Sequence, residues 1–351
     1  MAHTDATQTH TPIARVIGLG LALAAVVSVI VLAFAWPSVT AEAHDLPIAI
    51  TGPAELVTAA KEAIETQQPG AIAFTEVDDR AAAVAAIESR EVYGAIVLGA
   101  EPEVLSSSAS SLVVAQLLGG IATGLEEGVN AQAAAAAAAA GAPVAPPHID
   151  VVVADVVPLA ESDPRGTGLT ASLFPLVLGG MIGGIAISIA VIGALRRVLA
   201  VAVYSAVGGL ALTGILQGWF GALQGDYWLN VAAISLALAA IAAPITGFVA
   251  LFGRAGIAVG PVVMLLFANP ISGAALPKEF LPEPWGDVGQ WFPPGAAATL
   301  VRELSYFPAA DTTFPWLVLA AWAVGGLVLS VIGHFRTAGG AEPDAEAAVA
   351  G

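Results

Sequence analysis

The chain has 351 residues, of which 57% are apolar and only 11% are charged. Globular proteins typically contain about 45–50% apolar and about 25% charged residues, so this composition is not that of a soluble globular chain. The formal net charge of −17 argues against binding to nucleic acid, which requires a basic surface. Cysteine is absent, which excludes disulfides, thiol catalysis and cysteine-ligated metal sites.

Long uncharged segments indicate a polytopic membrane protein. A helix needs roughly 20 apolar residues to cross the hydrocarbon core of a bilayer, and six intervals between charged residues can supply them. Membrane lipid is therefore an expected partner. The predicted spans are residues 16–35, 170–195, 198–216, 229–252, 256–275 and 314–335.

The distribution of arginine predicts the orientation of these spans. Lys and Arg accumulate in the cytoplasmic loops of membrane proteins. If the N-terminus lies inside, five arginines close to the spans are all cytoplasmic. These residues are Arg15, Arg196, Arg197, Arg254 and Arg336. We expect a multi-pass protein of the plasma (inner) membrane, with a cytoplasmic N-terminus (residues 1–15) and a cytoplasmic acidic tail (residues 336–351).

The first apolar segment has a second interpretation. Arg15, the apolar run and Ala41-Glu42-Ala43 resemble a signal peptide with its small-residue cleavage site. The run of about 20 residues is longer than the apolar core of about 7–15 residues in a signal peptide, so we favour an uncleaved helix. In both cases the chain that follows lies outside the cytoplasm.

Residues 36–168 form a polar insert with 18 acidic and four basic side chains. Short β-branched runs alternate with helical segments, which predicts a small, largely parallel α/β sheet. The predicted strands are residues 46–52, 71–77, 93–99, 104–109 and 148–158, and the predicted helices are 53–68, 78–90 and 110–140. No Gly-x-Gly-x-x-Gly series is present, so we expect a structural or protein-contact role rather than a small-molecule site. The predicted fold is an α-helical polytopic membrane protein with an extracytoplasmic α/β domain between its first two spans.

The sequence lacks the motifs of common catalytic and metal sites. The only lysines, Lys61 and Lys278, do not follow a phosphate-binding loop. The histidines show no pair at the spacing of a helical zinc site, and no Gly-x-Ser-x-Gly elbow exposes a nucleophile. We therefore expect no enzyme, no catalytic residue, no cofactor and no metal site. The spans contain no carboxylate or lysine, which argues against proton-driven transport.

Glycines in the second predicted span indicate close contacts between helices. The segment Gly179-Gly180-Met-Ile-Gly183-Gly184 has the small-residue spacing that lets helix backbones approach one another. Packing within the chain is the first interpretation of this segment. A dimer interface is the second.

The most distinctive pattern begins near the end of the fifth span. Proline removes a backbone donor and moves the preceding residue away from helical angles, so Asn269-Pro270 predicts a break in the helix. Residues 277–313 are rich in proline and aromatic residues, which predicts two short interfacial helices in the outer leaflet. The candidate residues of this structural or translocation motif are Asn269, Pro270, Gly273, Pro282, Trp285, Pro293 and Pro294.

This arrangement resembles the ABC-2 type transporter permeases, in particular the branch close to the YhgE/Pip membrane proteins. The resemblance rests on Asn269-Pro-Ile-Ser-Gly273, Leu281-Pro-Glu-Pro-Trp285, Phe292-Pro-Pro-Gly295 and Arg90-Glu-Val-Tyr-Gly-Ala-Ile-Val97. It implies the transmembrane permease subunit of an exporter, working as a homodimer or heterodimer with a separate ATP-binding subunit. Any ATPase activity would reside in that partner. The alternative is a non-transporting envelope scaffold or receptor whose outer domain binds partners.

Overall fold

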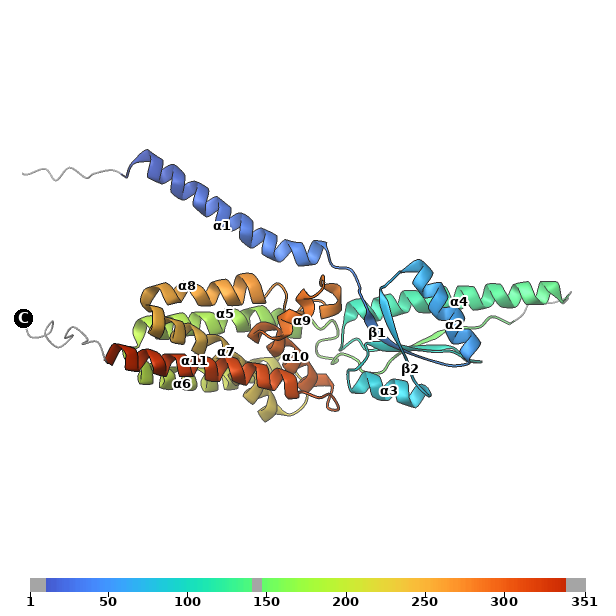
Figure 1. Cartoon of the computed structure of the whole chain (residues 1–351). Helices are drawn as coiled ribbons and strands as arrows, with labels where there is room; N and C mark the ends of the chain where they lie inside the picture. Colours follow the sequence, from blue (N-terminus) through green and yellow to red (C-terminus); the bar gives the residue numbers. More distant parts are fainter. Residues whose placement is uncertain (1–10, 141–146, 339–351) are drawn as a thin grey trace, which may run out of the picture.

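A small sheet domain and a bundle of long apolar helices make up the chain, and the helix α1 (Ile13–Val39) approaches the bundle near its C-terminal end and slants away from it (Figure 1). The computed structural model describes residues 11–140 and 147–338. The first ten residues of the predicted N-terminal segment and residues 339–351 of the predicted acidic tail lie outside the described residues.

The α/β domain contains a five-stranded sheet in the order β2-β1-β3-β4-β5. Its strands are β1 (Leu46–Thr51), β2 (Ile72–Glu76), β3 (Gly94–Val97), β4 (Glu103–Ser106) and β5 (Val152–Asp155). Strand β1 pairs in parallel with both β2 and β3, and β4 pairs in parallel with β5. The pair formed by β3 and β4 is antiparallel. A small, largely parallel sheet is therefore present.

Three helices cover the two faces of this sheet. They are α2 (Ala54–Gln67), α3 (Arg80–Glu88) and α4 (Leu112–Ala139). Alternate residues of a strand point to opposite faces. Accordingly Ile48 and Ile50 are buried with residues of α2 and α4, whereas Ala49 is buried with residues of α3. The side chains of Asp79 and Ser111 each accept a backbone hydrogen bond at the start of α3 and α4, which fixes where these helices begin.

Within the described residues, six helices are long and apolar enough to cross a membrane, and five of them coincide with predicted spans. These five are α1, α5 (Thr167–Ala190), α6 (Ala194–Thr213) with its π-helical extension Gly214–Trp219, α7 (Tyr227–Phe252) and α11 (Thr313–Ala338). The sixth is α4, whose Val114, Leu118 and Ala122 are buried in the core of the α/β domain.

The predicted span 256–275 is helical over only part of its length. A 3-10 turn (Gly253–Ala255) leads into α8 (Gly256–Pro261), and a π-helical stretch (Val262–Ala268) follows it. The helix ends immediately before Asn269. Residues 269–312, called the connecting segment, then run to α11. This segment contains a 3-10 turn (Lys278–Phe280), α9 (Trp285–Gln290) and α10 (Pro293–Tyr306).

The helix α7 lies at the centre of the bundle and packs against α5, α6 and α11. Gly180 and Gly184 of α5 lie directly against α7, and Gly183 lies against the ring of Tyr204 in α6. These three glycines therefore serve packing within one chain. The connecting segment packs on the same core, because Ala297 and Leu300 of α10 are buried among residues of α7 and α11.

Candidate functional site

A cavity of about 610 Å³ that is lined in part by charged side chains lies where the α/β domain meets the connecting segment. Its walls come from the chain between α3 and β3, from the connecting segment and from the start of α11. Acidic side chains outnumber basic ones around it. The charged residues that line it are Arg90, Glu91, Lys278, Glu279, Asp287, Arg302, Glu303 and Asp311.

An ion pair joins the two parts of the chain at this cavity. Nη1 of Arg90 donates to Oε1 of Glu303 in α10 at 2.9 Å, and the two side chains are only 14% and 11% exposed. The guanidinium of Arg90 also lies 5.7 Å from the ring centre of Phe307, at the distance of a cation–π contact. The pair is therefore shielded from water on the side of Phe307.

The backbone at Arg90 is in a conformation that favours glycine. Its φ is 61°, in the left-handed region, because the N–H of Glu91 turns back to the carbonyl of Ala86 and ends α3. A residue with a side chain is disfavoured there by roughly 1–2 kcal/mol. Such a position persists when other contacts compensate for it. The ion pair with Glu303 is that contact.

Further hydrogen bonds attach the α/β domain to the turn at residues 278–280. The hydroxyl of Tyr93 donates to Oε2 of Glu279 at 2.8 Å. Burial, followed by the charge of Glu279, raises the pKa of Tyr93, so the hydroxyl stays protonated and donates. The backbone N–H groups of His44 and Glu42 donate to the carbonyls of Glu279 and Phe280 at 2.9 and 3.3 Å.

Two buried polar atoms at this site have no hydrogen-bond partner among the described residues. They are Nε of Arg302 and Oε2 of Glu303. Burial lowers the pKa of Arg302 to about 10, with the charge of Arg90 as the next cause, whereas burial raises the pKa of Glu303. Buried polar groups are nearly always paired, so these two atoms are exceptions inside the contact between α10 and the α/β domain.

The predicted motif residues shape this region rather than supply its charges. Gly273, with φ 66°, lines the large cavity, and Asn269 and Pro270 line a neighbouring one of about 200 Å³ together with Phe34 of α1. The other four residues do not line either cavity. Pro282 and Trp285 flank the start of α9, with the Trp285 ring packed edge-on against Phe267, and Pro293 and Pro294 are buried in the first turn of α10.

The structure places the five predicted orientation residues at one end of the bundle. Arg15 lies in the first turn of α1, Arg196 and Arg197 in the first turn of α6, Arg254 between α7 and α8, and Arg336 near the end of α11. All of these helix ends are remote from the α/β domain (Figure 1). Arg197 also donates to the carbonyls of Val191 and Ser188 at the end of α5.

Sequence patterns missed the charged residues of the cavity. Arg90 and Tyr93 were noted only as part of the segment 90–97 that carries the family resemblance. Glu279, Arg302 and Glu303 were not predicted as site residues. One local signal was available. Arg302 and Glu303 are adjacent charges in α10, whose other residues carry no charge, and buried charges need partners.

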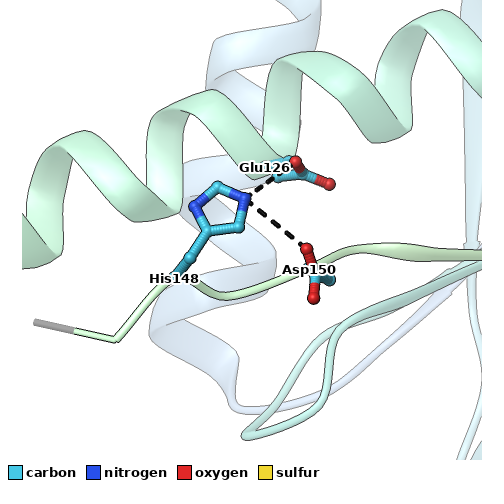
Figure 2. Close-up of side chains that lie close together, drawn as sticks. All are labelled: Glu126, His148 and Asp150. Carbon is cyan, nitrogen blue, oxygen red and sulfur yellow. Dashed lines mark hydrogen bonds and ion pairs between the residues drawn. The ribbon is translucent and has the colours of Figure 1, made fainter.

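Within the described residues, the one group of side chains that could hold a metal ion lies outside this cavity, in the α/β domain. It consists of Glu126, His148 and Asp150 (Figure 2). No protein-family model, curated protein or solved structure matches the chain.

Proposed function

We propose that the protein is the transmembrane permease subunit of an ABC-2 type exporter, working as a dimer with a separate ATP-binding subunit. The observation that supports this most is the buried ion pair between Arg90 and Glu303. It couples the α/β domain to a short helix that is inserted between the ends of long apolar helices. The resemblance of the sequence to such permeases points to the same function.

The packing of α10 gives this coupling a mechanical role. Ala297 and Leu300 are buried against α7 and α11, so a shift of either long helix must move α10 and Glu303 with it. Interrupted helices inside a membrane are tolerated where protein or a cavity satisfies their polar groups, and transporters place substrates there. An ATP-driven movement of the bundle would thus separate Arg90 from Glu303 and open the cavity.

The orientation that this function requires has the α/β domain outside the cytoplasm and both termini inside. The position of five arginines at the opposite end of the bundle supports it. Because the chain has no cysteine, single introduced cysteines report position directly. In intact cells, a membrane-impermeant thiol reagent should label Glu88→Cys on α3, but label Thr337→Cys only after permeabilisation. The reverse pattern would contradict the orientation.

Purification of the tagged full chain from its native membrane tests the function itself. We expect an ATP-binding subunit to co-purify and the complex to hydrolyse ATP, because the chain has no phosphate-binding loop of its own. ATP hydrolysis by the pure chain alone would contradict the assignment. Recovery of envelope proteins without an ATP-binding subunit would favour the alternative function, a non-transporting envelope scaffold or receptor.

One observation favours a non-transporting envelope scaffold or receptor as the second candidate. At the arginine-rich end of the bundle, α5 and α6 are joined by residues 191–193 alone, and α7 and α8 by the turn at 253–255. Connections this short offer an ATP-binding subunit little surface to engage. In the scaffold, the α/β domain binds partner proteins and the bundle anchors it.

A further inference from the structure

Three side chains of metal-ligand type converge on the α/β domain (Figure 2). Glu126 comes from the middle of α4, and His148 and Asp150 come from the chain that leads into β5. Nε2 of His148 lies 3.2 Å from Oε1 of Glu126 and 3.5 Å from Oδ1 of Asp150. The three donor atoms all lie within 4.8 Å of one another.

The spacing around Nε2 of His148 also suits a small cation. A ring nitrogen carries at most one proton, so it cannot donate well-aligned bonds to two carboxylates at once. Zn²⁺ binds histidine nitrogen and carboxylate oxygen at about 2.0–2.2 Å in tetrahedral geometry, which places neighbouring donors about 3.3–3.6 Å apart. The two distances from Nε2 of His148 are close to this range.

Neighbouring hydrogen bonds fix the carboxylate of Glu126 and the backbone on either side of Asp150. Asn130, one turn beyond Glu126 on α4, donates to the carbonyl of Ile149 at 2.8 Å and accepts from its N–H at 2.9 Å. Oε2 of Glu126 accepts from the N–H of Val151 at 3.1 Å, which leaves Oε1 to face His148. Residues 148 and 150 alternate with the clamped Ile149, so both side chains lie on the side of Glu126. Fixed donors of this kind favour metal binding.

We propose that Glu126, His148 and Asp150 bind a divalent transition-metal ion, with Zn²⁺ as the best match. One imidazole and two carboxylates are donors that Zn²⁺ accepts, whereas Ca²⁺ and Mg²⁺ prefer six or more oxygen donors. The exposure of His148 and Asp150 leaves the remaining coordination positions open to water. The ion ties α4 to the chain entering β5, and this role does not depend on whether the protein exports a substrate.

Zinc titration of the purified full chain tests the proposal. The protein is treated with a chelator and carries no polyhistidine tag. We expect one Zn²⁺ per chain at this site, and weakening by at least about tenfold in His148→Ala, Asp150→Asn and Glu126→Gln, since even outer-shell changes cost about 10–100-fold. Glutamine at residue 126 still accepts from Val151. Excess Mg²⁺ or Ca²⁺ should not displace the zinc.

Two control variants make the result specific. Glu127→Gln changes the exposed neighbour on α4, and His44→Ala removes a histidine outside the cluster, so both should bind zinc as the parent chain does. Size-exclusion chromatography verifies that each variant is folded. Zinc binding that is equal in the parent chain and in folded His148→Ala would overturn the proposal, and so would stronger binding of Ca²⁺ than of Zn²⁺.

Discussion

The variant Arg90→Gly is expected to separate the α/β domain from α10. Removal of one partner from a buried ion pair costs about 3–5 kcal/mol, because the other charge remains buried without compensation. Glu303 is that charge, with its side chain 11% exposed. Glycine accepts the left-handed backbone at this position, so the turn after α3 gains stability. The loss of stability therefore comes from the contact between the α/β domain and α10. Denaturation of the full chain, compared between the variant and the parent, measures this loss.

A second substitution distinguishes the loss of the ion pair from nonspecific destabilisation of the fold. The double variant Arg90→Gly with Glu303→Gln removes both charges and should be more stable than Arg90→Gly alone. The matched control is Arg80→Ala, which breaks an ion pair with Glu103 in which Arg80 is 53% exposed. Exposed pairs contribute less than about 1 kcal/mol, so this change should be nearly silent.

The effect of Arg90→Gly should also depend on pH. Burial raises the pKa of Glu303, and Arg90 opposes that shift. A raised folded-state pKa means that the contribution of Glu303 to stability is complete below the ordinary value of about 4.3 and is lost as the pH rises through the folded-state pKa. Without Arg90 the pKa rises further. The deficit of the variant should therefore be small in acid and grow toward neutral pH; a deficit independent of pH would contradict this origin.

The variant Gly326→Leu should prevent normal assembly of the bundle, whereas Gly325→Leu should not. A Cβ at Gly326 would overlap the backbone of Ala243 and Pro244 in α7, and backbone cannot move aside as a side chain can. A Cβ at Gly325 has no atom within 4 Å. Overpacking costs typically about 1–3 kcal/mol, and we expect at least the upper end here. The midpoint of thermal unfolding in detergent is measured for both variants. An equal decrease in both would show that α7 and α11 do not pack as described.

Much of the fold follows from local sequence signals. In β1, the buried Ile48 and Ile50 alternate with residues on the other face, and Asp79 and Ser111 cap the helices that follow strands. The long apolar spans are equally local, because twenty uncharged residues identify them. The end of the helix at residue 268 lies next to Asn269-Pro270, from which a break was predicted, although the predicted span continued to residue 275.

The charged site depends on tertiary contacts that no local pattern encodes. Arg90 and Glu303 are 213 positions apart, so the adjacent charges of Arg302 and Glu303 indicate that partners are needed but do not identify Arg90 as one of them. The same holds for Glu126 and His148, which are 22 positions apart. Gly273 was recognisable because a tight turn needs glycine, but its φ of 66° concerns the path of the backbone and does not identify the side chains that the turn brings together.

The helix α4 determines how far the protein reaches. At about 1.5 Å per residue its 28 residues span about 42 Å, and its second half, rich in alanine, continues past the sheet and away from the bundle (Figure 1). The residues of α4 that are buried in the domain core, such as Val114 and Leu118, lie in its first half, and Asn130 just beyond them binds the backbone of Ile149. A partner that binds near the far end of α4 would therefore act on the α/β domain from a distance. A small force there would tend to rotate the whole domain, including Arg90.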